Sequence, residues 1–191
     1  MANVSRPLGA RPVMYFGGAV YTGAARLYHV PASDATALTI GDLVKLTGAG
    51  DANGVPTVTR YAANTDLMVG AIVGFLPDKV YEGQIYRTAS TLRYALVADD
   101  PNLLYEMQAN AAFAATTDPG LNVGVTFTAV STSTGLSNMQ LDMATKATTS
   151  TLPFRIIGLK QSVENDITDT SNMKVLVAVN NAQAKVGATG L

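Results

Sequence analysis

Along this chain, apolar and polar residues alternate over short runs, which is the period of a β-strand rather than of a helix. Residues 123–130 (VGVTFTAV) alternate in this way, and Met139, Leu141 and Met143 do so within a Ser/Thr-rich stretch. Residues 67–75 (LMVGAIVGF) are apolar on both faces, as in a central strand. These runs predict a mixture of half-buried and fully buried strands.

Further runs of strand composition lie at 57–61, 86–98, 103–108, 152–159 and 173–179, and on both sides of a Gly-Asp turn at 41–42. The run at 103–108 (LLYEMQ) also contains good helix formers. Because it follows an Asp-Asp-Pro-Asn turn, we favour a strand that returns as the partner of a hairpin. The Ala-rich residues 109–115 are expected to form one helical turn or a loop.

Turn residues separate these runs. Residues 48–56 (GAGDANGVP) form a turn by composition, because Gly and Asn accept positive φ and Asp and Asn bond their own backbone. Strands at intervals of roughly ten to fifteen residues, with no long amphipathic helix between them, predict an all-β fold. We expect a small β-barrel or a jelly-roll-like sandwich with little helix.

The first 33 residues break this pattern. They carry positive but no negative side chains, and their prolines exclude a helix or the interior of a sheet. We interpret residues 1–33 as an extended N-terminal arm or a loosely paired edge segment, placed either on another chain or across the bottom of its own barrel. Residues 34–180 then form a single β domain, and residues 181–191 form a flexible C-terminal tail.

Charge is scarce, at 14% of the residues against roughly 25% in a typical soluble domain. A surface rich in Thr, Ser, Asn and Gly suits a subunit that meets other subunits, because fewer ions lose their water on docking. A secreted Thr/Ser-rich β domain is the alternative. The formal net charge of -1 provides no basic field for nucleic acid, so we expect no such partner.

Membrane segments and targeting signals are not predicted. The longest apolar stretch, residues 67–77, is too short to span a bilayer, and residues 1–12 lack the apolar segment of a signal peptide. We therefore expect synthesis in the cytoplasm and no membrane association.

Catalytic or metal-binding chemistry is not indicated either. Cysteine is absent, and His29 is the only histidine, which we expect to be a partly buried or interface ring. Asp99 and Asp100 precede a proline and read as turn residues. The stretch from Asp51 resembles the start of a calcium loop, but Val55 stands where that loop needs an oxygen ligand. We predict no enzyme, no cofactor and no metal site.

Several short motifs along the chain point to a known family. They lie at 29–34 (HVPASD), 41–45 (GDLVK), 54–58 (GVPTV), 69–75 (VGAIVGF), 86–87 (YR), 94–100 (YALVADD) and 155–159 (RIIGL). Through these motifs the chain resembles a family of tailed-bacteriophage head proteins, the cement or decoration proteins, over most of its length. The motifs are structural rather than catalytic.

The resemblance implies a subunit that binds the outer surface of an expanded icosahedral head and bridges neighbouring major capsid proteins. Its location would be the virion, after synthesis in the host bacterium. Packaged DNA pressurises a head, and a subunit that binds only the expanded lattice stabilises it by mass action at every repeated site.

The arm supplies the contact residues expected for this role. Arginines would meet acidic surface and aromatic rings would fill apolar pockets of a neighbouring subunit. The candidates are Arg6, Arg11, Tyr15, Phe16, Tyr21 and Arg26. Deleting the arm is expected to abolish capsid binding and to leave the barrel folded. A charge-poor face also favours self-association, and closed symmetry around capsid axes favours a trimer over a dimer or monomer.

Two other functions stay open. A head–tail connector or tail component would also be β-rich, free of cysteine and poor in charge, but would be present in far fewer copies per particle. A carbohydrate-binding module would use exposed aromatic platforms, preferably Trp, and here Tyr would have to replace it because Trp is absent.

Overall fold

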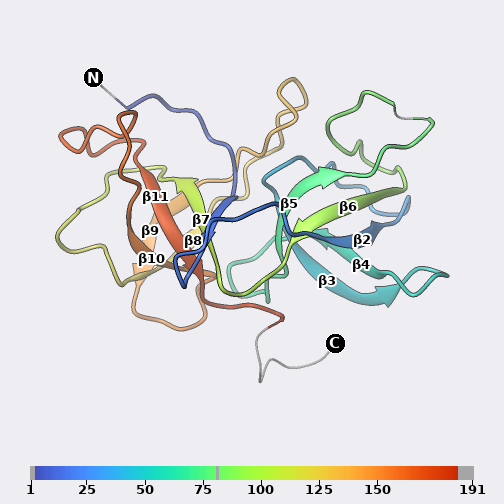
Figure 1. Ribbon diagram of the computed structural model, residues 1–191, viewed down its shortest axis with the longest axis horizontal. Coiled ribbons are helices and arrows are strands. Elements are labelled where there is room, and N and C mark those ends of the chain that lie inside the picture. The colour runs from blue at the N-terminus through green and yellow to red at the C-terminus, as the bar shows by residue number, and fades with distance from the viewer. Residues whose placement is uncertain (1–2, 81, 185–191) are drawn as a thin grey trace.

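The computed structural model describes residues 3–80 and 82–184, and these residues contain eleven strands and no helix (Figure 1). The strands are β1 (Arg11–Tyr15), β2 (Arg26–Val30), β3 (Leu43–Gly50), β4 (Pro56–Arg60), β5 (Gly70–Phe75), β6 (Arg93–Ala98), β7 (Leu103–Gln108), β8 (Asn122–Val125), β9 (Leu141–Ala147), β10 (Phe154–Leu159) and β11 (Lys174–Val179). The predicted all-β class with little helix is confirmed.

Six strands form one antiparallel sheet in the order β1-β7-β11-β10-β8-β9. Its edge strand β1 tolerates Pro12, opposite Tyr105, because a proline lacks the N–H that a central strand would need. At the other edge, Ala109 forms a bridge with Leu141, and the Asn110 N–H donates to the Leu141 carbonyl at 3.0 Å. The sheet therefore curls until the end of β7 meets the start of β9.

The other five strands pair in the order β2-β4-β3-β5-β6, and β6 pairs in turn with β2. All these ladders are antiparallel except β2 with β4, which meet through one parallel pair, His29 with Thr57. The five-stranded sheet is thus a small cylinder held closed at one seam by a short contact. Figure 1 shows it beside the six-stranded sheet, with the N-terminal chain running across the front between the two.

Two hydrophobic cores fill these sheets. The core of the six-stranded sheet includes Tyr105, Phe154 and Met107, and it also contains Leu43 and Ala71 from the five-stranded sheet. The interior of the five-stranded sheet has a smaller core of its own, made mainly of valines with Tyr28, Leu38 and Ile72. The first core therefore extends across the junction and fixes one sheet on the other.

Most predicted strands are present, but several are shorter than predicted, and the run at 38–40 before the Gly-Asp turn forms isolated bridges rather than a strand. Of residues 86–98 only β6 is a strand, because the chain before it turns around the buried Arg87. Of residues 123–130 only the first three belong to β8, and residues 109–115 form a loop rather than a helical turn. The run at 103–108 is β7, as favoured.

The N-terminal segment is extended but packs on its own chain. Residues 3–10 have no regular secondary structure, β1 pairs with β7, and β2 pairs with β6. The predicted boundary at residue 33 is therefore no structural boundary. Of the predicted tail, residues 185–191 lie outside the described residues, whereas Asn181 and Gln183 exchange backbone hydrogen bonds of 3.0 and 2.7 Å with Met68.

Candidate functional site

Two glycines bring the N-terminal segment against the five-stranded sheet. The Ala10 N–H donates to the Gly41 carbonyl at 2.9 Å, and both Gly9 and Gly41 have positive φ, +68° and +89°. A Cβ on Gly9 would lie 2.3 Å from the Gly41 oxygen, and one on Gly41 would lie 2.2 Å from the Leu8 oxygen. Only glycine permits this approach, which positions β1 at the junction of the sheets.

A buried carboxylate next to this contact ties the two sheets together. Asp42 is fully buried; its Oδ2 accepts hydrogen bonds from the Thr39 N–H at 2.7 Å and the Thr39 hydroxyl at 2.9 Å. Its Oδ1 accepts from the Ser137 hydroxyl at 2.7 Å and pairs with Arg60 at 3.2 Å. Ser137 belongs to the connection between β8 and β9, so the carboxylate joins the two halves of the molecule.

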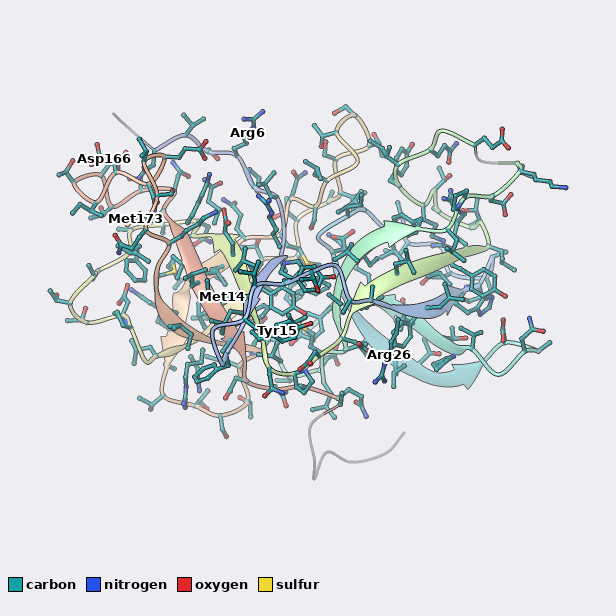
Figure 2. All side chains as sticks on the ribbon, viewed as in Figure 1. Arg6, Met14, Tyr15, Arg26, Asp166 and Met173 are labelled. Atoms are coloured by element: carbon teal, nitrogen blue, oxygen red, sulfur yellow. The ribbon has the colours of Figure 1, made fainter. Side chains whose placement is uncertain are left out.

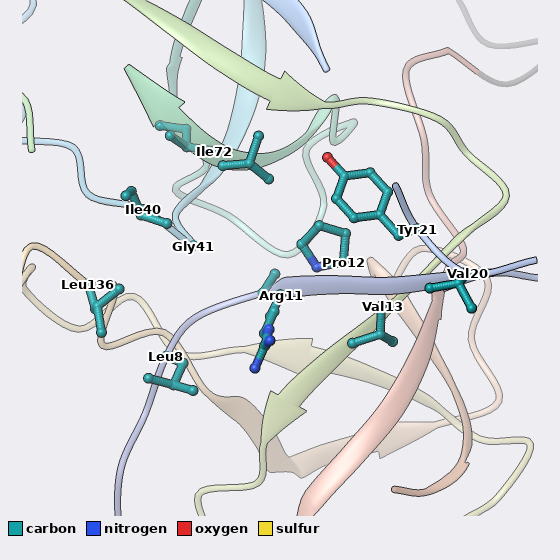
Figure 3. Close-up of a pocket in the computed structure, with 12 residues that line it drawn as sticks. Leu8, Arg11, Pro12, Val13, Val20, Tyr21, Ile40, Gly41, Ile72 and Leu136 are labelled. Carbon is teal, nitrogen blue, oxygen red and sulfur yellow. The ribbon is translucent and has the colours of Figure 1, made fainter. Parts of the chain in front are cut away.

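Beside this joint lies an open apolar hollow of about 630 Å³. Figure 3 shows its lining, in which Ile72 comes from β5 and Val13 from β1, so that both sheets contribute. The complete lining is Leu8, Ala10, Arg11, Pro12, Val13, Val20, Tyr21, Ile40, Gly41, Ile72, Val73 and Leu136. Arg11 is the only charged side chain among them. The site therefore suits an apolar group better than a polar substrate.

A short hairpin next to the hollow presents apolar side chains to solvent. After β1 the chain reverses, with the Gly18 N–H bonded to the Tyr15 carbonyl at 2.9 Å and the Tyr15 N–H to the Ala19 carbonyl at 2.7 Å. Phe16 at its tip is 66% exposed, and Val20 on its return arm is 71% exposed. We call residues 11–21 the β1 hairpin. Its return arm covers part of the edge of β1, which limits open-ended strand pairing there.

The structure distributes the six predicted contact residues along the N-terminal chain, as Figure 2 shows for Arg6, Tyr15 and Arg26. Tyr15 and Tyr21 come together, with ring centroids 6.5 Å apart, and both pack partly against the larger core. Burial and the neighbouring Tyr15 raise the pKa of Tyr21, whose protonated hydroxyl donates to the Ala24 carbonyl at 2.9 Å.

The three arginines differ in what they contact. Arg26 is paired with Asp99 of its own chain at 3.5 Å, although its side chain is largely exposed. Within the described residues, the guanidinium of Arg11 has no ion-pair partner, and it lies at the mouth of the hollow. Arg6 lies apart from both, where its backbone N–H donates to the Gln108 side chain at 2.9 Å.

A second exposed apolar surface surrounds Arg6. Val163 is fully exposed, and Val4 and Ile167 are 76% and 66% exposed. Together with Arg6, Glu164, Asn165, Asp166 and Lys174 they line an open hollow of about 650 Å³, and we call this the Val163 face. Asn3 fixes the N-terminal chain here, because its side-chain amide donates to the Asp166 and Asp169 carbonyls at 3.0 and 2.7 Å.

Buried polar groups elsewhere have structural partners. His29 contacts the Thr57 hydroxyl through Nδ1 at 3.0 Å and packs on Tyr94, as a buried ring. Arg87 is fully buried and donates to the carbonyls of Pro31, Asp34, Thr36 and Thr91. Burial lowers the pKa of Arg87, while the charge of Asp34 opposes that shift. These groups hold loops in place.

The described part of the chain has neither a metal-binding cluster nor a membrane-spanning helix. It contains no group of three or more His, Cys, Asp or Glu side chains placed to hold a metal ion. None of its segments forms a helix long and apolar enough to cross a membrane.

Sequence reasoning missed Val4, Val20, Val163 and Ile167, four of the most exposed apolar residues. For Val163 and Ile167 a signal was present, since they are isolated apolar residues in a polar stretch (SVENDIT) with neither strand nor helix period.

Comparison of the chain with protein-family models, curated proteins and solved structures gives no match.

Proposed function

We propose that this protein is a structural subunit of a tailed-bacteriophage virion that binds the outer surface of the expanded head and cements neighbouring major capsid proteins. The observation that carries the proposal is the exposure of apolar side chains on the β1 hairpin and on the Val163 face of a charge-poor protein. Exposed apolar side chains that gather into one patch, rather than lying singly, are typical of surfaces that become buried in an assembly.

The physical logic of such a subunit agrees with the structure. An apolar contact is insensitive to salt and loses few hydrated ions on docking, whereas contacts between charged rims weaken as salt rises. Each contact can be modest, because repetition over the lattice adds binding free energy at every site. The Asp42 and Gly9–Gly41 contacts that fix the two sheets on each other reduce the ordering required on binding.

The Val163 face is our candidate for the capsid contact. Its apolar centre of Val4, Val163 and Ile167 is surrounded by charges of both signs. Arg6 is among them, so one of the six predicted contact residues keeps its proposed role. Lys174 pairs with Glu164 at 2.6 Å, and Arg6, whose charge also acts on Glu164, is the second positive group that an acidic group of the capsid would meet.

The test is binding of purified protein to expanded heads that lack it, measured by co-sedimentation. Val163→Asp should weaken binding at least about tenfold, because a charge would be buried in an apolar contact. Val80→Asp is the matched control. Val80 is 78% exposed on the connection between β5 and β6, and its replacement should leave binding unchanged. Figure 1 shows this connection at the opposite end of the molecule from the connection between β10 and β11, which carries Val163. Equal binding by both variants would remove the Val163 face from the contact.

Deletion of residues 1–33 no longer makes a clean test. The deletion would remove β1 and β2, and β2 carries Tyr28 and Val30 of the smaller core. We expect such a fragment to lose the five-stranded sheet, so point variants replace the deletion.

The alternatives predict different outcomes of the same preparations. A head–tail connector or tail component would sediment with particles but would not saturate the lattice. A carbohydrate-binding module would bind glycans through exposed rings, such as Phe16 or Phe127 among the described residues, and would not sediment with heads.

A further inference from the structure

We infer that the β1 hairpin is a self-association surface, through which two copies of this chain pair about a two-fold axis. Each copy would place Phe16 in the apolar hollow beside the other copy's hairpin. The inference goes beyond the proposed function, does not require the head as a partner, and proposes a dimer in place of the trimer expected from the sequence.

Phe16 and the apolar hollow lie on one surface, and Phe16 is not among the residues that line the hollow of its own chain. Phe16 is 66% exposed at the tip, although it is a large apolar side chain. The hollow of about 630 Å³ lies within the roughly 300 to 1,000 Å³ typical of ligand pockets, so it has room for an aromatic ring. Val13 and Val20 of the same hairpin line it, so the tip and the hollow are neighbours.

The charges at the two ends of β1 also favour a second copy as the partner. Arg11 lies at the start of β1 and at the mouth of the hollow. At the other end of β1, Tyr15 lies beside Asp99 and Asp100, in a depression that also contains Arg26. Arg26 pairs with Asp99, so Asp100 supplies the remaining negative charge there. Neither Arg11 nor Asp100 has an ion-pair partner within residues 3–80 and 82–184.

Together these features make the surface self-complementary. A positive group at one end of the hairpin and a negative group at the other match each other when a second copy is turned by a two-fold rotation. The same rotation brings each Phe16 towards the partner's hollow. A capsid protein would need a complementary surface that nothing in this chain specifies, whereas a second copy supplies it. Because the contact is isologous, it closes at two copies.

The backbone of the hairpin supports a fixed rather than a mobile tip. The Phe16 N–H donates to the Asn102 carbonyl at 2.8 Å, and the Tyr21 N–H donates to the Val13 carbonyl at 3.1 Å. A preorganised knob loses little entropy on docking.

The test is sedimentation equilibrium of the purified full chain, without heads, over a wide concentration range. We expect a species of twice the 19.9 kDa of one chain. Phe16→Asp should raise the dissociation constant of this dimer at least about tenfold, because Phe16 would be a central anchor. Val80→Asp, which changes an apolar residue that is 78% exposed on the connection between β5 and β6, should leave self-association unchanged.

Charge reversal tests the two-fold arrangement itself. Arg11→Asp and Asp100→Arg should each weaken pairing, and the double variant should recover it, because each new charge meets its opposite on the other copy. Circular dichroism checks that Asp100→Arg, which loses the hydrogen bond from the Asn102 N–H, still folds. A monomeric wild type, a species of three times the chain mass, unchanged pairing of Phe16→Asp, or a double variant without recovery would each overturn the inference. Failure of head binding would overturn only the proposed function.

Discussion

The two sheets of this protein are filled in different ways. The core of the six-stranded sheet contains aromatic rings and methionines, among them Tyr105, Phe154 and Met107. The core of the five-stranded sheet contains no methionine and consists mainly of β-branched residues such as Val58 and Val97. Methionine adapts to irregular space, whereas valine has few rotamers and packs well in narrow interiors.

Buried polar contacts compensate for the smaller core. In the five-stranded part, Arg87 binds four backbone carbonyls, and Asp42 bonds with Thr39, Arg60 and Ser137. The six-stranded part also buries carboxylates, Glu106 and Asp118, but these pair with lysines that reach the surface. Arg87 and Asp42 are themselves fully buried, so their loss would leave buried atoms of the five-stranded part without partners.

The largest effect should come from removing a polar group of the five-stranded part. Arg87→Met should lower the free energy of unfolding by about 3 to 5 kcal/mol, because buried carbonyls lose their donor. Arg155→Met is the control, since Arg155 is exposed on β10 and should change stability by less than about 0.5 kcal/mol. Urea denaturation of both variants measures the difference. A similar small loss in both would refute the role given to Arg87.

The junction between the sheets should be next. Gly9 has positive φ, and the Cβ of Gly9→Ala would lie 2.3 Å from the Gly41 oxygen. We therefore expect the free energy of unfolding to fall by about 2 to 4 kcal/mol. Gly23 also has positive φ, +94°, but a Cβ there meets nothing within 4 Å. Gly23→Ala should therefore lose only about 1 to 2 kcal/mol, and the excess in Gly9→Ala measures the contact itself. Equal losses in thermal or urea unfolding would show that the close approach is unimportant.

Core substitutions sharpen the comparison further. Val97→Leu adds a methylene to the narrow five-stranded interior and should lower stability by about 1 to 3 kcal/mol. Met107→Leu in the other core conserves volume and should lower it by less than about 1.5 kcal/mol. Urea midpoints of the two variants, at equal m-values, give the result. A greater loss in Met107→Leu would reverse our view of which core is more tightly filled.

The smallest effect concerns pH. The hydrogen bond from the Tyr94 hydroxyl to Asp51, 2.6 Å long, together with the Val55 N–H, lowers the pKa of Asp51 to about 2. A lowered pKa stabilises the fold above the unfolded value of about 3.9, and this contribution disappears as the pH falls through about 2. In Tyr94→Phe the Asp51 pKa should rise towards its ordinary value, and an NMR titration of its carboxyl carbon measures this. Tyr86→Phe is the control. An unchanged Asp51 pKa in Tyr94→Phe would contradict the assignment.

Much of the fold follows from local pattern. Alternating or wholly apolar runs identified β5, β7, β10 and β11, because their periods are those of strands. The strands β1 and β2 were predicted only as part of an arm or a loosely paired edge segment, since Pro12 and the polar residues of β2 obscure the period. Pairing with β7 and β6 makes them strands. Likewise, the approach of Gly9 to Gly41 depends on tertiary contacts that no local pattern contains.

Of the candidate site, the sequence predicted the segment better than the individual roles. Phe16 is exposed, as a contact residue should be, but Arg26 is paired with Asp99 and Tyr21 is partly packed inward. Val163 lies in a loop far along the chain from Arg6 and Val4, so their proximity required the fold. Side-chain exposure in loops depends on long-range packing and could not be derived from residue type.

The most direct measurement is the copy number of this chain in particles sedimented from the native source lysate, by quantitative staining against the major capsid protein. The cement role predicts a ratio near one or a simple fraction set by capsid symmetry. A chain that stays in the soluble fraction would contradict the virion assignment. A chain present in only a few copies per particle would instead support the head–tail connector.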